Sequence, residues 1–299
     1  MPQVRCEYPR VACDGPPVSS DRQRTSRVLS AMRRRLRRTI TVTHYADRNP
    51  NMIRRYLLTV ASALTLIGSP VGSAGQLHAA DFFKLGAQPQ LSLAEAAADG
   101  RTDELEKLVS KGADVNAQGV DGMTALYWAM AHSSKKGVNW LLTHRANPNV
   151  IFTRDGTSAT SLAAMQEDSW FLIQVLLHGG DPNIRNPLNE HTPIFDALAA
   201  NLDLNVRTLI GVGADMNTYD HLGLTPLVEA AANQRYELVY DMLIAGADPT
   251  MTVPKGRGNK TILSVVRRSQ VRPDAPPYQW QLKVIELLKQ KGLDVEHGE

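Results

Sequence analysis

The segment Gly213-Ala214-Asp215-Met216-Asn217 recurs along this chain of 299 residues. Four other segments follow the same pattern, and they begin at Gly112, Arg145, Gly179 and Gly246. Their third residues, starting from Asp114, follow one another at intervals of 33, 34, 34 and 33 residues. A fixed period of this length is the signature of a repeat architecture, in which each unit buries its apolar face against its neighbours.

A second marker keeps the same period ahead of each segment. It reads Thr124-Ala125-Leu126, Ser158-Ala159-Thr160, Thr192-Pro193-Ile194 and Thr225-Pro226-Leu227. A threonine side chain can accept a hydrogen bond from the free N–H groups at a helix start, and proline suits the first helical position. The marker therefore predicts that a helix begins after Thr124, Thr192 and Thr225.

The residues between these markers predict two helices in each unit, an inner one and an outer one, with a glycine that caps the end of the outer helix. Small pairs suit closely packed inner helices, apolar pairs suit the buried stripe of outer helices, and the glycine supplies a left-handed residue at the helix end. The small pairs are Ala96/Ala97, Ala163/Ala164 and Ala230/Ala231; the apolar pairs are Leu108/Val109, Leu141/Leu142, Val175/Leu176, Leu209/Ile210 and Met242/Leu243.

These residues resemble the ankyrin repeat family, whose unit of about 33 residues carries a T-P-L-H-x-A signature. The resemblance covers roughly residues 90–296 and implies an all-α solenoid domain over 90–299, with five repeats and an atypical C-terminal cap. The first unit, 91–116, lacks the Thr-Pro start, as a terminal unit can. The cap, from Thr261, carries about ten extra residues between its helices, around Pro273, which predicts a protruding loop.

The histidine of the family signature is absent throughout. Tyr127, Ser161, Phe195 and Val228 stand in its place. This departure puts the usual hydrogen bonding between repeats in doubt, but it does not put the fold in doubt.

Charge is distributed unevenly along the chain. The formal net charge of +3 combines +7 in residues 1–51, +2 in residues 52–79 and −6 in residues 80–299. Both cysteines, Cys6 and Cys13, also lie in the first segment. The basic balance therefore belongs to the N-terminal quarter, and we expect the acidic repeat domain to bind no nucleic acid.

Residues 52–79 have the layout of a secretory signal peptide. Arg54 and Arg55 precede an 11-residue apolar run, and small residues follow at positions suited to cleavage near Ala74 or Ala79. The run is too short for a membrane span. We therefore expect a periplasmic or secreted protein without a stable membrane anchor, exported by the general secretory route in preference to the twin-arginine route.

A signal peptide that begins at residue 52 leaves residues 1–51 to be explained. Our hypothesis is that Met52 is the true start and that residues 1–51 are a basic, disordered or mis-annotated upstream segment. The alternative is a basic arm that binds nucleic acid or membrane, with the arginine run 33–38 as its footprint.

Catalytic and metal-binding patterns are weak. The six histidines after the signal peptide form no H-E-x-x-H pattern, and the glycine-containing loop around Lys260 lacks the glycine that a phosphate-binding loop needs before its lysine. We expect no enzyme activity, no cofactor and no metal. The alternative is an enzyme whose site lies on the loop 267–279.

The expected function is binding of another protein through the concave face of the solenoid. In the ankyrin family the hairpin tips and inner helices are the usual binding positions, and the resemblance implies a surface that runs from apolar to acidic. We expect an exposed hot spot around Trp128, although Trp128 could instead pack against Leu162 and fill the core. The implied partner-binding residues are Met123, Trp128, His132, Phe152, Arg154, Leu162, Met165, Arg185, Asp196, Tyr219, His221 and Glu229.

The partner's identity does not follow from the sequence. Resemblance to exported bacterial ankyrin proteins implies either an immunity protein that neutralises a toxin or a scaffold for stress and other envelope proteins. We expect the protein itself to be a monomer.

Overall fold

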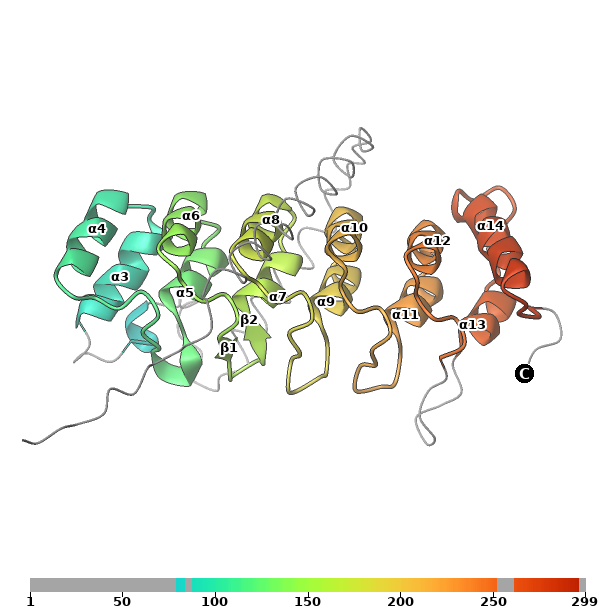
Figure 1. Cartoon of the computed structure of the whole chain (residues 1–299), viewed down its shortest axis with the longest axis horizontal. Coiled ribbons are helices and arrows are strands. Elements are labelled where there is room, and N and C mark those ends of the chain that lie inside the picture. The colour runs from blue at the N-terminus through green and yellow to red at the C-terminus, as the bar shows by residue number, and fades with distance from the viewer. Residues whose placement is uncertain (1–78, 84–87, 252–260, 296–299) are drawn as a thin grey trace, which may run out of the picture.

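The structure, a computed structural model, describes residues 79–83, 88–251 and 261–295. In this part of the chain, twelve α-helices follow one another as six antiparallel pairs along an elongated stack (Figure 1). The pairs are α3 (Gln88–Ala98) with α4 (Thr102–Ser110), α5 (Ala125–Ala131) with α6 (Lys135–Thr143), α7 (Ala159–Ala164) with α8 (Trp170–Leu177), α9 (Pro193–Ala199) with α10 (Asp203–Val212), α11 (Pro226–Ala232) with α12 (Tyr236–Ile244), and α13 (Ile262–Arg268) with α14 (Pro277–Gln290). This arrangement confirms the all-α repeat solenoid.

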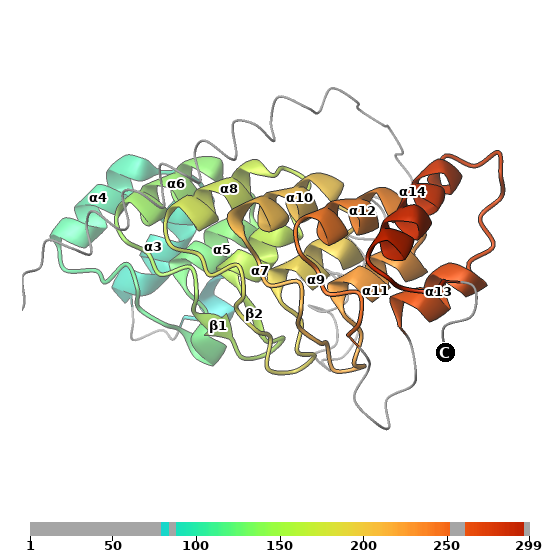
Figure 2. The ribbon, with the colours of Figure 1, turned by 45° about the vertical axis from the view of Figure 1, so that its right-hand side comes forward.

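The helices form two layers, with the connecting hairpin loops projecting on one side (Figure 2). The inner layer consists of the first helix of each pair, where Ala97, Ala163 and Ala230 are completely buried. The layers also approach closely at Gly137 of α6, because a side chain there would overlap the carbonyl oxygen of Ala97 in α3. Small residues at these positions set the spacing between neighbouring units.

Side-chain caps begin most inner helices as the sequence predicts. Thr124 Oγ1 accepts from Tyr127 N at 3.1 Å, and Thr225 Oγ1 accepts from Val228 N at 3.3 Å. The helix predicted after Thr192 does begin there, at Pro193, but the side-chain cap is missing, because the buried Thr192 hydroxyl makes no hydrogen bond. There the backbone carbonyl of Thr192 accepts from Phe195 N at 2.9 Å and takes the donor that the side chain would have used.

One or two residues past the end of each outer helix the backbone is left-handed, a conformation that favours glycine because it has no Cβ. Gly213 has φ of 87° and Gly246 has φ of 103°. Arg145 holds the equivalent place after α6 with φ of 65°. The period is therefore maintained at this position by backbone conformation even where the residue differs.

Asparagines of the recurring segment connect one repeat to the next. Asn183 Oδ1 accepts from Asp215 N at 2.7 Å, and Asn217 Oδ1 accepts from Asp248 N at 2.8 Å. At the missing histidine position, Tyr127 OH bonds to Thr157 Oγ1 of the next unit at 2.7 Å. Hydrogen bonds between repeats thus persist without the family's histidine.

Two features lie outside the regular helix pairs. A short antiparallel ribbon pairs β1 (Ile151–Phe152) with β2 (Thr157–Ser158) in one hairpin loop, and the sequence analysis did not predict it. In the C-terminal cap, Thr261 and Ser264 form a reciprocal capping box, and residues 269–276 separate α13 from α14, which confirms the extra length between these helices.

The predicted N-terminal features lie almost wholly outside the described residues. The basic segment 1–51 and all of the signal peptide except Ala79 belong to the part of the chain that the structure does not describe. Within the described ranges, every helix is too short or too polar to cross a bilayer.

Candidate partner-binding surface

A short segment ahead of the first helix pair covers the apolar end of the concave face. Its 3₁₀ turn η1 (Ala79–Asp81) leads into Phe82, whose carbonyl accepts from Val120 N at 2.6 Å. The Phe82 ring lies 5.6 Å from the ring of Trp128 and 5.9 Å from the ring of Phe152, and Phe82 is only 1% exposed. The chain itself therefore fills this apolar site.

The expectation of an exposed hot spot around Trp128 is consequently wrong. Trp128 is 6% exposed, and Met123, Phe152 and Leu162 are also buried. The burial of Trp128 agrees with the alternative, in which it fills the core; its ring lies 4.4 Å from that of His132 and 5.6 Å from that of Phe82, a neighbour that the sequence does not predict.

The two predicted arginines brace the hairpins on which they lie. Arg154 forms a 2.8 Å ion pair with Asp121 of the preceding loop. Arg185 forms a 2.8 Å ion pair with Glu190 and donates to the carbonyl of Tyr219 in the next hairpin at 2.6 Å. Both remain exposed, so each guanidinium connects neighbouring tips while still facing solvent.

Three further residues predicted to bind the partner differ in how exposed their side chains are. His132 is exposed, and its ring lies 4.4 Å from that of Trp128 while its Nδ1 bonds to the Trp128 carbonyl at 2.9 Å. Met165 and Tyr219 are half-buried. His132 is therefore accessible to a partner, whereas Met165 and Tyr219 are only partly accessible.

A group of ionisable side chains occupies the concave side of the fourth and fifth repeats. Asp196, on α9, is buried, and its Oδ1 lies 3.5 Å from His191 Nδ1. Burial raises the pKa of Asp196 although His191 opposes the shift. Burial lowers the pKa of His191, but Asp196, Glu229 and Asp220 outweigh it and raise that pKa overall.

Glu229, on α11, belongs to the same group. Burial raises its pKa to about 7, with the charges of Asp220 and Asp196 adding to the shift and His191 opposing it. We call His191, Asp196, Asp220 and Glu229 the acidic recess. Asp196 and Asp220 are both buried, so most of these carboxyl groups lie below the surface, and an acidic C-terminal end of the face stays a prediction.

Two hairpin tips beside the acidic recess expose leucines. Leu188 is 62% exposed and Leu222 is 54% exposed. Both follow the same turn, because Asn186 Oδ1 accepts from Leu188 N at 2.8 Å and Asp220 Oδ1 accepts from Leu222 N at 2.9 Å. The sequence analysis missed both leucines; their spacing of 34 residues, one repeat, was the available signal.

His191, Asp220 and His221 also come together at these tips. Each offers one ligand atom, and the three atoms lie within 4.8 Å of one another. In the sequence, 30 residues part the two histidines and no short motif links them. Only the stacking of neighbouring hairpins brings them side by side.

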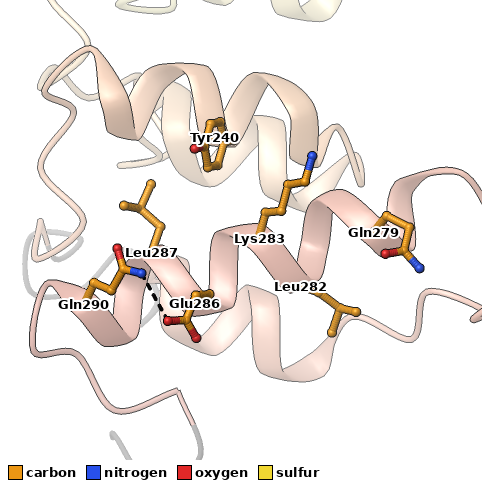
Figure 3. A pocket seen from close by; sticks show the side chains of 7 residues that line it. All are labelled: Tyr240, Gln279, Leu282, Lys283, Glu286, Leu287 and Gln290. Carbon is orange, nitrogen blue, oxygen red and sulfur yellow. Dashed lines mark hydrogen bonds between the residues drawn. The ribbon is translucent and has the colours of Figure 1, made fainter.

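A separate shallow pocket of about 360 Å³ lies between α12 and α14, away from the hairpins (Figure 3). Tyr240 reaches it from α12, and Lys283, Leu287 and Glu286 reach it from α14. Glu286 accepts a hydrogen bond from Gln290 at 3.1 Å. Gln290 thus helps to hold the Glu286 carboxylate at the edge of the pocket.

Comparison with known proteins agrees with the repeat geometry. A family model described as ankyrin repeats (3 copies) matches residues 160–253, and one described as ankyrin repeats (many copies) matches residues 93–142. Both fall on the helix pairs described above.

Three individual relatives come from a bacterium, a virus and a mammal. Protein PhlB of Serratia liquefaciens is 32% identical over 145 residues, which cover 48% of this chain and 63% of that protein. A putative ankyrin repeat protein of fowlpox virus is 31% identical, with 46% of this chain and 42% of the relative covered. Human ankyrin repeat and SOCS box protein 3 is 30% identical, with 56% and 33% covered. The chain spans less than two thirds of the length of each of these relatives. Both family models are of ankyrin repeats, the viral and human relatives are named for them, and the chain belongs to the ankyrin repeat family.

Proposed function

We propose that this protein is a non-catalytic module of the cell envelope that binds a partner protein through the hairpin tips of its fourth and fifth repeats. Ankyrin repeats indicate a protein–protein interaction module. The observation that carries the proposed surface is the exposed pair Leu188 and Leu222 beside the acidic recess. The apolar end of the concave face, already filled by Phe82, is not part of it.

The leucine pair suits an anchor contact. Leucines that are more than half exposed on adjacent tips bury apolar area when a partner covers them, and each buried CH₂ contributes about 0.8 kcal/mol. The tips are also held in place, because His221 N donates to the Asn189 carbonyl of the preceding hairpin at 3.0 Å. A pre-ordered surface loses little entropy when it binds.

Charge favours a particular kind of partner. The acidic recess and the net charge of −6 over residues 80–299 would attract a partner whose contact surface combines apolar side chains with lysine or arginine. Such complementarity accelerates association and weakens as salt increases. The proposed partner is therefore a protein with a basic rim around an apolar centre.

Export supports the envelope part of the proposal. The sequence of residues 52–79 is typical of a signal peptide, and the repeat domain contains no cysteine that an oxidising compartment would alter. The alternative of an enzyme on the loop 267–279 has little support. Its one carboxylate, Asp274, is exposed and lies 3.9 Å from exposed Arg272.

A capture experiment with matched variants tests the surface. Wild-type protein, the double variant Leu188→Glu/Leu222→Glu and the control Ile244→Glu would be incubated with envelope extract and compared by quantitative mass spectrometry. Ile244 lies on an outer helix and, like Leu188, is 62% exposed, so it matches the change in exposed area. We expect a partner retained by wild type and Ile244→Glu to be lost by the double variant; equal retention by all three would contradict the proposed surface.

The two finer roles make different predictions for the captured protein. An immunity protein forms a tight one-to-one complex that inhibits a toxin, and its deletion sensitises cells to toxin-armed neighbours. A scaffold binds envelope proteins without inhibiting them. We propose the immunity role first, because an ordered acidic surface suits rapid capture of a basic toxin; a partner whose activity is unchanged by binding would assign the scaffold role.

A further inference from the structure

We propose that His191, Asp220 and His221 form a binding site for one divalent transition-metal ion, with Zn²⁺ as the ion that the donors fit best. The three ligand atoms already lie within 4.8 Å of one another on neighbouring hairpins. Two imidazoles and one carboxylate are a common Zn²⁺ ligand set, whereas Ca²⁺ and Mg²⁺ prefer oxygen ligands throughout. Small movements of side chains would bring the atoms to bonding distance.

Both histidines have the second hydrogen bond typical of metal ligands. His191 Nδ1 faces the Asp196 carboxylate at 3.5 Å, and His221 Nδ1 lies 2.9 Å from the Asn189 carbonyl oxygen. When Asp196 is ionised, both of these oxygens accept, and Nδ1 of each neutral ring carries the proton. The lone pair is then on Nε2, the nitrogen that a metal ion would take.

Asp196 is the independent observation that points to a bound cation. It is 6% exposed, and its Oδ2 has no hydrogen-bond partner among the described residues. A buried carboxylate with an unsatisfied oxygen is costly unless a positive charge lies nearby. A metal ion bound to His191 would place a positive charge on the far side of the His191 ring from Asp196. The Asp196 carboxylate would then orient the His191 ring as a metal ligand.

The third ligand is also held in place. Asp220 Oδ1 accepts from Leu222 N at 2.9 Å and from Leu224 N at 2.7 Å, so the carboxylate is fixed at the base of its turn. The backbone bond from His221 N to Asn189 O, at 3.0 Å, connects the two hairpins that supply the ligands. Glu229, on α11, adds negative charge to this group when its carboxyl is ionised.

Three protein ligands leave a fourth tetrahedral position for water or for a side chain from outside the chain. The metal site does not depend on the proposed partner, because all three ligands belong to this chain. It can therefore exist even if the leucine surface binds nothing.

Metal binding would be measured on the untagged full chain after chelator treatment and dialysis. Equilibrium dialysis against Zn²⁺, read by elemental mass spectrometry, gives the number of ions bound and the affinity. Co²⁺ is the spectroscopic probe, because its visible absorption reports a tetrahedral site with nitrogen and oxygen ligands. We expect one Zn²⁺ per chain and a thermal unfolding temperature that increases with Zn²⁺.

Two variants test the histidine ligands, a third tests the carboxylate behind His191, and a fourth is the control. His221→Ala changes an exposed side chain and should keep the fold while losing the bound ion and the Co²⁺ spectrum. His191→Ala should do the same, and Asp196→Asn should weaken the affinity about 10- to 100-fold. His178→Ala, an exposed histidine at the end of α8, should leave binding unchanged. Absence of Zn²⁺ from wild type, or equal binding by His221→Ala and wild type, would overturn the proposal.

Discussion

The ring of Phe82 lies 5.6 Å from the ring of Trp128, so a residue that precedes the first helix pair closes the apolar end of the concave face. Phe83 is buried beside it, and the Phe82 carbonyl accepts from Val120 N at 2.6 Å. The segment thus acts as a cap on the first two repeats. It covers surface that would otherwise be an exposed aromatic patch.

Removing the Phe82 ring should destabilise the protein strongly. Phe82→Ala deletes a completely buried aromatic side chain and leaves Trp128 and Phe152 without their neighbour, which typically costs roughly 3 to 5 kcal/mol. Urea unfolding followed by tryptophan fluorescence measures the change. Leu188→Ala, at a position 62% exposed, is the control and should stay within about 0.5 kcal/mol of wild type. A similar effect of both substitutions would show that the segment does not hold the cap.

A substitution at Arg145 should stabilise the protein. It has a left-handed backbone with φ of 65°, which costs an L-residue about 1 kcal/mol relative to glycine. Arg145→Gly should therefore stabilise the protein by about that amount. The reverse change, Gly213→Ala, should destabilise it similarly, because φ is 87° there and a Cβ would meet nothing within 4 Å. Chemical denaturation of the two variants should give shifts of opposite sign; shifts of the same sign would contradict the shared conformation.

Gly137 should tolerate no side chain. A Cβ there would overlap the Ala97 carbonyl, which also accepts from Ser134 Oγ at 2.7 Å, so α6 would have to move away from α3. We expect Gly137→Ala to cost roughly 1 to 3 kcal/mol, although alanine is the better helix former. Asn139→Ala on an exposed position of the same helix is the matched control. A stabilising effect at both positions would mean that the close contact is absent.

Local signals were enough to predict the repeat stack. The threonine start, the small inner pairs and the left-handed turn all act within one unit of about 33 residues, and Thr124 and Gly213 behave as such signals require. The one cap that fails, Thr192, fails because a nearby backbone carbonyl competes for the same donor. That competition depends on small differences in turn geometry that residue type does not determine.

The surface was harder to predict because it depends on contacts between units. Trp128 lies where the family's exposed position predicts, yet it is buried, and its neighbours include Phe82 from outside the repeat pattern. His191 and His221 become neighbours through stacking of hairpins, and Leu188 and Leu222 are exposed because their turns direct them outward. Periodicity locates these residues in the unit, but it does not say what covers them.

Glu229 predicts how stability depends on pH in chelator-treated protein. Burial raises its pKa from 4.5 to about 7, with Asp220 and Asp196 adding to the shift and His191 opposing it. The folded state therefore holds this proton more tightly than the unfolded state. The resulting stability is present below pH 4.5 and is lost as the pH rises through about 7.

The loss should be on the order of 1 to 3 kcal/mol, allowing for partial solvation of Glu229. Glu229→Gln cannot ionise and should remove this part of the pH dependence. Urea midpoints at pH 5 and pH 8, with chelator present, give the comparison. If the variant lost as much stability as wild type over this interval, another group would be responsible.

The η1 turn predicts which of the two expected cleavage sites of the proposed signal peptide is used. Ala79 is buried, and its carbonyl accepts from Phe82 N and Phe83 N, both at 3.0 Å. Cleavage after Ala79 would remove this acceptor and the buried methyl group, whereas cleavage after Ala74 would keep both. We therefore expect the mature chain to begin at Gly75.

Intact mass of the protein from the envelope fraction measures the mature start. Leucine at the cleavage position obstructs processing, because small residues are required there. Ala74→Leu should therefore block or move the cleavage, whereas Ala79→Leu should leave the start at Gly75. A wild-type start at Ala80 would show that the turn forms without its buried acceptor. A start upstream of residue 52 would contradict the export hypothesis, because the apolar run 57–67 would then remain attached to a folded repeat domain.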